Sequence, residues 1–402
     1  MLKRSISKSI LKLAKKYPVL TLTGPRQSGK TTLLRNLFPD YTYVNLENLR
    51  ELNFANKDPE GFLARYSDGV IIDEIQNAPH LTSYIQVIVD ERKKDAMFIL
   101  TGSQNFSLIE SVNQSLAGRT AIFELLPFSY EEIKDSKYHK EFKAKTSKKQ
   151  IASVNEKLNI DKLMFKGFYP RIYDKNIPAS DFYADYIKTY VERDLRQLKA
   201  IHNLSSFKKF LGLCAARIGQ PLNLTNISSD LGVSSTTLKE WLSVLEASYI
   251  IYLLQPFSLN INKQLTKSPK LYFIDTGLLI YLLNINRPED LFMHSLRGNI
   301  FENLIVIEIL KRNLNQHLRP NIFFYKDRQH EVDLIYKTKK EGYAALEIKS
   351  ASTYISEFQH SLQYLKKILG KDLTREGLIY TGTETYQLKE LRINNIESLE
   401  II

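Results

Sequence analysis

The segment from residue 19 to residue 37 constrains the fold most, because it joins a strand pattern, a glycine-containing loop and a helix pattern. Val19–Thr23 is apolar and β-rich, residues 24–31 read Gly-Pro-Arg-Gln-Ser-Gly-Lys-Thr, and Thr31–Leu37 continues as a helical run. The loop fits the spacing G-x4-G-K-S/T. Its two glycines let successive N–H groups point at phosphate oxygens, and the following helix adds its positive end. We therefore predict a phosphate-binding loop.

Individual loop positions have expected roles. Lys30 is expected to reach the β and γ phosphates, and the Thr31 hydroxyl is expected to coordinate Mg²⁺. The other expected nucleotide contacts are Gly24, Pro25, Arg26, Gln27, Ser28, Gly29 and Thr32. A phosphate loop with a hydroxyl after its lysine predicts a nucleotide and a magnesium ion as cofactors.

A second motif supplies carboxylates. The apolar run Val70–Asp73 is followed at once by Glu74. Asp73 is expected to hold the Mg²⁺ hydration shell, and Glu74 to polarise a water for in-line attack on the γ-phosphate. The acidic pair favours hydrolysis over transfer to another acceptor. It also disfavours the alternative of a switch that binds the nucleotide without hydrolysing it and so controls DNA binding.

Two further polar residues are candidates for the reaction. Ser103 follows the apolar run Met97–Thr101 and is expected to position the attacking water. Arg119 is a candidate cation for transition-state charge, acting in cis or from a neighbouring subunit. A surface or structural arginine is the alternative interpretation of Arg119.

The first 130 residues alternate between strand and helix patterns. Strands are expected at Val19–Thr23, Tyr41–Leu46, Val70–Asp73 and Met97–Thr101, with helices between them, as at Leu81–Arg92. Near-continuous apolar strands are typical of a parallel sheet buried on both faces. The expected fold class is α/β, with a parallel sheet flanked by helices.

Several longer segments follow one another along the chain: GPRQSGKTTLL, GVIIDEIQNAP, FILTGSQNF and SLAGRTAIFELLPFS, then KSPKLYFIDTGLL and HEVDLIY. In these segments the chain resembles the AAA-type ATPase family of bacteria and archaea that carries a C-terminal domain similar to restriction endonucleases. The resemblance implies ATP as the nucleotide. The expected division is an ATPase core at 1–135, a basic linker and helical lid at 136–205, a winged-helix-like domain at 206–270 and a nuclease-like α/β domain at 271–402.

The middle of the chain reads as helix, turn and helix, followed by a β-rich stretch. Ser235 or Thr236 is expected to cap the second helix, and Ile250–Leu254 to form a strand. This order suggests a winged helix that contacts DNA. Because its exposed side offers Lys239 beside Glu240, packing or a subunit contact is an equal alternative.

The C-terminal region predicts a second site. Asp333 and the Glu347-x-Lys349 pair are expected on adjacent strands, and Glu302 on the preceding helix. Two carboxylates, a helix glutamate and a lysine suit a second divalent metal and fit the P-D/E-x-K nuclease pattern that the family implies. A module that binds without cutting, or a solvated strand face, is the alternative.

The charge and composition of the chain limit which partners and which cellular location we expect. The net charge of +12 makes nucleic acid a candidate partner, and self-association is a further candidate. The basic segment at residues 1–16 reads as a first domain helix or, alternatively, as a transit peptide or membrane-surface helix. A single cysteine and the absence of a long apolar run predict a cytoplasmic protein without a membrane partner.

Overall fold

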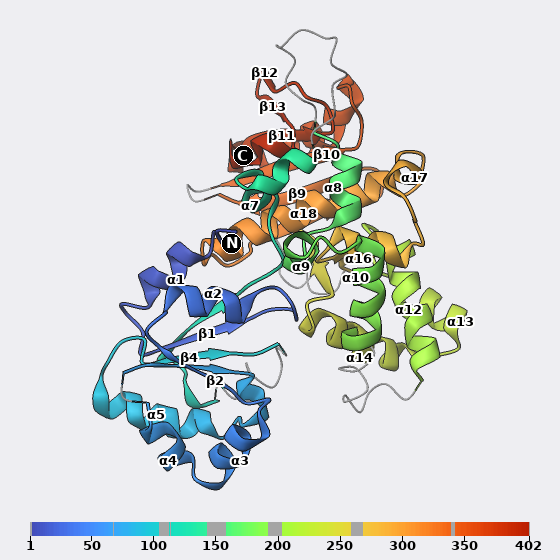
Figure 1. Ribbon diagram of the computed structural model, residues 1–402. Helices are drawn as coiled ribbons and strands as arrows, with labels where there is room; N and C mark the ends of the chain where they lie inside the picture. The colour runs from blue at the N-terminus through green and yellow to red at the C-terminus, as the bar shows by residue number, and fades with distance from the viewer. Residues whose placement is uncertain are drawn as a thin grey trace.

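The computed structural model describes residues 2–66, 68–103, 112, 114–142, 158–191, 203–258, 268–338 and 342–401. The fold is α/β, with one sheet near the N-terminus and a separate sheet near the C-terminus (Figure 1). The N-terminal sheet is blue at the bottom of Figure 1, and the C-terminal sheet is orange and red at the top. No helix in the described ranges is long and apolar enough to cross a membrane.

Within the described ranges, five parallel strands form the N-terminal sheet, in the order β2-β3-β4-β1-β5. The strands are β1 (Val19–Thr23), β2 (Thr42–Asn45), β3 (Val70–Asp73), β4 (Phe98–Thr101) and β5 (Thr120–Glu124). The carboxyl end of β1 therefore lies between the ends of β4 and β5. The expected parallel sheet is confirmed, and β5 is a strand that the sequence analysis did not list.

Helices cover both faces of this sheet because neighbouring strand residues point to opposite sides. Leu20 and Leu22 share one buried core with Ile6 and Ile10 beside α1. Val19 contributes to the other face. The helices of this region are α1 (Ser7–Leu13), α2 (Lys30–Leu37), α3 (Leu49–Lys57), α4 (Pro59–Ala64) and α5 (Leu81–Arg92). The basic N-terminal segment thus belongs to the packed core of the fold.

Helices dominate the middle of the chain. They are α7 (Tyr130–Lys134), α8 (Ile160–Lys166), α9 (Pro170–Asp174), α10 (Ala179–Tyr186), α12 (Leu204–Ala216), α13 (Leu224–Leu231) and α14 (Ser235–Ala247). Two antiparallel strands follow, β6 (Ile251–Leu254) and β7 (Lys270–Phe273). Ser234 caps α14 through the N–H of Thr237, so the expected cap at Ser235 or Thr236 was wrong. The cap falls one residue earlier because Ser235 already has helical geometry.

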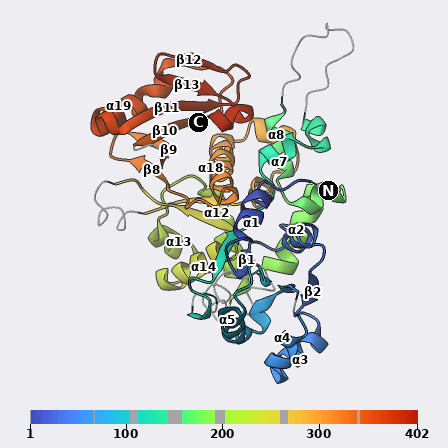
Figure 2. The same cartoon turned by 90° about the vertical axis from the view of Figure 1, so that its left-hand side faces the viewer.

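Helices α16 (Thr276–Leu282), α17 (Pro288–Phe292) and α18 (Arg297–Asn315) lead into the C-terminal sheet, and α19 (His360–Leu369) covers it. The described strands are β8 (Ile322–Lys326), β9 (Glu331–Lys337), β10 (Tyr343–Lys349), β11 (Leu373–Tyr380), β12 (Tyr386–Leu388) and β13 (Leu391–Asn394). Strands β8, β9 and β10 form an antiparallel meander, which places Asp333 and the Glu347-x-Lys349 pair on adjacent strands as expected. Strand β11 runs parallel to β10, so the sheet is mixed. Figure 2 shows α18 beside this sheet, where it links the sheet to the middle helices.

Candidate functional site

The phosphate loop follows β1 and takes a conformation that depends on its glycines. Gly24, Gln27 and Gly29 all have positive φ, of 143°, 62° and 93°. A Cβ on Gly24 would lie 2.2 Å from the carbonyl oxygen of Leu125, so a side chain is excluded there. Gly29 forms the left-handed N-cap of α2, and Thr32 lies exposed on the first turn. The loop is therefore shaped by backbone freedom at its two motif glycines.

Lys30 is buried at the centre of the loop, with a relative exposure of 7%. Its Nζ donates hydrogen bonds to the carbonyl oxygens of Gly24 at 2.8 Å and Pro25 at 2.9 Å. Burial lowers the pKa of Lys30 from 10.5 to about 8, although Glu74 and Asp73 oppose this effect. A buried ammonium whose hydrogen bonds go to neutral carbonyls has a charge that the nearby carboxylates compensate only in part, which suits an anionic ligand.

Asp73 lies at the carboxyl end of β3 and accepts three hydrogen bonds. The hydroxyls of Thr31 and Tyr43 donate to its Oδ2 at 2.7 and 2.8 Å. The Glu74 N–H donates to its Oδ1 at 3.1 Å. Burial, and then the bond to Asp73, raises the pKa of Tyr43 far above its usual value. The residues expected at the metal side of the site are therefore in direct contact.

Glu74 has a left-handed backbone, with φ of 58°. Ser103, at the end of β4, donates to its Oε2 at 3.2 Å, and the amide of Gln76 also donates to Oε2. The two residues expected to handle water thus meet beside Asp73. Gln104 and Asn105, the other polar residues of that segment, lie outside the described residues.

Arg119 does not reach the phosphate loop of its own chain. Its carbonyl accepts the N–H of Val19, so it lies beside the first residue of β1, at the amino edge of the sheet. The loop follows the opposite, carboxyl edge. The guanidinium instead forms a two-bond pair with Asp90, at 2.6 and 2.7 Å. Of the roles left open for Arg119, action in cis has no support in this geometry, because parallel strands place strand starts and strand ends at opposite edges. Action on a neighbouring subunit stays a prediction, and a structural role stays the alternative.

The four residues expected at the C-terminal site lie near one another, and lysines pair with its three carboxylates. Lys349 contacts Glu347 at 2.6 Å and Asp333 at 3.4 Å. Glu302 accepts hydrogen bonds from Lys270 at 2.9 Å and from the Tyr272 hydroxyl at 2.6 Å. Neither of these two partners was predictable from the motif, because both lie on β7, in another part of the chain.

Lys270 also contacts Glu331 at 2.6 Å and has no exposed surface. In the described part of the chain, no group of three or more His, Cys, Asp or Glu residues is arranged to hold a metal ion. The expected second divalent metal is therefore not supported by the described residues. The ammonium of Lys270 supplies the positive charge that these carboxylates need.

The second helix of the helix-turn-helix segment packs inward. Leu238 and Leu242 of α14 are buried, while Lys239, Glu240 and Glu246 are exposed. The exposed side of this helix is acidic overall, which does not favour contact with a phosphate backbone.

Comparison with known proteins divides the chain into three matched regions. Residues 16–134 match an AAA domain. Residues 157–289 and 297–399 match two domains of unknown function, DUF8612 and DUF4143. The chain therefore combines an AAA domain with a C-terminal DUF4143 domain.

This chain is also similar to other proteins along most of its length, and to solved structures along about two thirds of it. An uncharacterized protein of Mycobacterium tuberculosis is 29% identical over 93% of this chain and 78% of its own length. An uncharacterized protein of Haemophilus influenzae is 22% identical over 87% of this chain and 88% of its own length. A Walker-type ATPase of Pyrococcus abyssi has a TM-score of 0.44 at 15% identity, covering 69% of this chain and 94% of its own. The RuvB Holliday junction branch migration motor of Thermotoga maritima has a TM-score of 0.32 at 18% identity, and the match covers 66% of this chain and 96% of the motor's chain.

Proposed function

We propose that this chain binds ATP with Mg²⁺ at the end of β1 and hydrolyses it. One observation carries the proposal: Lys30, the Thr31–Asp73 contact and the Ser103–Glu74 contact meet at one edge of one sheet. The sheet edge then holds three groups side by side: a cation that can bind phosphate, oxygen atoms that can bind a metal ion, and a carboxylate that can accept a proton from water.

The oxygen donors fit a magnesium ion. Thr31 and Asp73 would hold it, because their hydroxyl and carboxylate oxygens already lie 2.7 Å apart. Tyr43 keeps Asp73 oriented through its own hydrogen bond. Bound Mg²⁺ supplies positive charge that neutralises the charge on the β and γ phosphates during transfer.

Glu74 is the proposed general base. Its Oε2 accepts hydrogen bonds from Ser103 and Gln76, which fix the carboxylate at the carboxyl edge of the sheet. From there it takes the proton of a water that attacks the γ-phosphate, and Ser103 helps to position that water. Lys30 holds the phosphate oxygens that become more negative.

We further propose that the nucleotide controls the rest of the molecule. The proposed division is an ATPase core at 1–135, a lid at 136–205, a winged-helix-like domain at 206–270 and a terminal α/β domain at 271–402.

The basic net charge supports nucleic acid as a partner, and Arg119 is proposed to act on a neighbouring copy. The nuclease alternative lacks support from a metal site.

The test is ATP turnover of the wild type, Lys30→Ala and Glu74→Gln, with and without DNA, followed by inspection of the DNA on a gel. Lys30→Ala is expected to lose ATP binding. Glu74→Gln is expected to bind ATP while turnover falls by about 10²–10⁴-fold. Full turnover by Glu74→Gln would contradict the role of this carboxylate, and metal-dependent cutting that Asp333→Ala abolishes would revive the nuclease alternative. A rise of specific activity with protein concentration would support Arg119 acting in trans.

A further inference from the structure

Arg4 lies on the short N-terminal arm before α1 and contacts the phosphate loop from outside. Its side chain is almost fully buried, with an exposure of 4%. Nη1 donates to the carbonyl of Ser28 at 2.8 Å, and Nη2 to the carbonyl of Leu126 at 2.6 Å. Nε donates to Oε1 of Glu132 at 3.2 Å. One side chain therefore joins the loop to the segment that follows β5.

The bond to Ser28 fixes the direction of a peptide unit in the loop. A trans peptide is planar, so the carbonyl of Ser28 and the N–H of Gly29 point in opposite directions, and no described peptide bond is cis. Because Arg4 holds this carbonyl from outside, the Gly29 N–H must face the inside of the loop. Loop N–H groups facing inward are the groups that bind phosphate oxygens.

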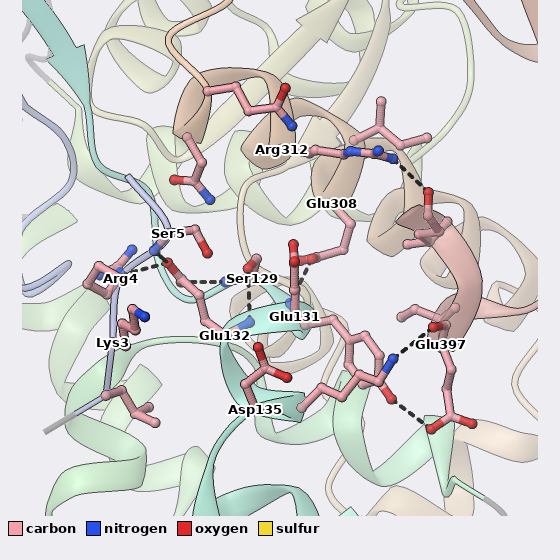
Figure 3. Close-up of a pocket in the computed structure, with 18 of the residues that line it drawn as sticks. Lys3, Arg4, Ser5, Ser129, Glu131, Glu132, Asp135, Glu308, Arg312 and Glu397 are labelled. Carbon is pink, nitrogen blue, oxygen red and sulfur yellow. Dashed lines mark hydrogen bonds and ion pairs between the residues drawn. The ribbon is translucent and has the colours of Figure 1, made fainter. Parts of the chain in front are cut away.

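Arg4 is itself held firmly at its other end. Glu132 accepts hydrogen bonds from the backbone N–H of Ser5 at 2.7 Å and of Ser129 at 3.0 Å, and the guanidinium lies over the ring of Phe128 at 4.9 Å. Figure 3 shows Arg4 and the backbone of Ser5 beside Glu132, and all three residues line a cavity of about 390 Å³. This stretch of the arm borders a cavity, so apolar packing around it is interrupted. The ion pair between Arg4 and Glu132 holds the arm in place there.

We infer that Arg4 is a positioning residue for ATP binding, which holds the Ser28–Gly29 peptide with its N–H toward the phosphates. This inference rests on the proposed ATP site and adds a residue outside the loop motif. Arg4 does not touch the nucleotide. Its removal frees one peptide to rotate, so nucleotide binding weakens while the groups that handle water are unchanged.

The kinetic test compares Arg4→Met and Arg4→Lys with the wild type. Arg4→Met is expected to raise KM and the Kd for ATP about tenfold, with kcat within about threefold. Arg4→Lys keeps the charge but has fewer donors, so it is expected to raise KM about threefold. The lysine variant also provides the answer if the methionine variant fails to fold.

Lys311→Met is the matched control. Lys311 is a buried cation that pairs with Glu308 at 2.9 Å and donates to the carbonyl of Phe128 at 2.8 Å, without contacting the phosphate loop. Its loss is expected to lower stability while the Kd for ATP stays within about twofold of the wild type. An equal rise of Kd in Lys311→Met and Arg4→Met would overturn the inference.

Hydrogen exchange separates this inference from the proposed function. In nucleotide-free protein, peptides covering residues 24–37 are expected to exchange faster in Arg4→Met than in Lys311→Met. Equal exchange in the two variants contradicts a role for Arg4 in the loop. If the wild type binds no ATP, the proposed function fails, and the exchange comparison still decides whether Arg4 orders the loop.

Discussion

Two buried lysines occupy opposite environments in this molecule. Lys30, in the phosphate loop, donates to the carbonyls of Gly24 and Pro25. Lys270, on β7, contacts the carboxylates of Glu302 and Glu331. Both ammonium groups lose water on burial, but only Lys270 regains full countercharges.

The pKa values reflect this difference. Burial lowers the pKa of Lys30 to about 8. Burial alone also lowers the pKa of Lys270, but the charges of Glu302, Asp333 and Glu331 outweigh it, so the pKa stands above its usual value. The charge of Lys30 is therefore not fully balanced by the protein, and an anionic ligand can supply the missing negative charge. The charge of Lys270 is balanced by its carboxylates without a ligand.

The largest expected effect concerns stability and separates the two lysines. Lys270→Met leaves the buried carboxylate of Glu302 without its cation and leaves the half-buried Glu331 with Lys326 alone. We therefore expect it to lower the free energy of unfolding by about 3–5 kcal/mol. Lys30→Met removes a charge whose burial is unfavourable, and we expect a change below about 1 kcal/mol. Urea denaturation of nucleotide-free protein measures both values.

Lys326→Met is the control for this comparison. Lys326 pairs with the same Glu331 but is partly exposed. We expect its loss to cost about 1 kcal/mol or less. Equal losses for Lys270→Met and Lys326→Met would contradict the account of the C-terminal cluster.

The lowered pKa of Lys30 predicts opposite pH dependences for ATP binding and stability. ATP binds the protonated lysine, so affinity is expected to fall by about tenfold per pH unit above pH 8. The unfolded chain, with a lysine pKa of 10.5, binds more protons than the folded chain between about pH 8 and 10.5. The contribution of Lys30 to stability therefore rises through that range. Affinity measured with a fluorescent ATP analogue from pH 7 to 9.5 checks the first effect, and a flat profile would contradict it.

The smallest expected effect concerns the orientation of Asp73. Tyr43→Phe removes one of the two hydroxyls that donate to Oδ2 of Asp73, while Thr31 keeps the other. We expect the Mg²⁺ concentration for half-maximal turnover to rise by about two- to tenfold. An unchanged Mg²⁺ requirement would show that Thr31 alone orients the carboxylate.

The phosphate loop was predictable because its signals are local in sequence. The strand Val19–Thr23, the glycine spacing and the helix start are all encoded within nineteen consecutive residues. Asp73 and Glu74 were predictable as the end of an apolar strand, since parallel strands end at a common edge.

The remaining contacts depend on pairs of residues far apart in sequence. Arg4 meets Ser28 and Glu132, and Lys270 meets Glu302, only after packing brings separate elements together. For Arg119, the choice between cis, trans and a structural role stayed open in the sequence, because β5 was not recognised and the edge of the sheet at which Arg119 lies was unknown. Lys270 was missed because a lysine in an apolar strand carries no local sign of its partners.

The most direct test of the comparison is the stoichiometry of Mn²⁺ binding, measured by electron paramagnetic resonance with and without ATP. The account predicts a single bound Mn²⁺ that requires ATP, is lost in Lys30→Ala and is unaffected by Asp333→Asn. Mn²⁺ binding without nucleotide that Asp333→Asn abolishes would contradict it, because the metal would then lie in the C-terminal cluster and not beside the phosphate loop.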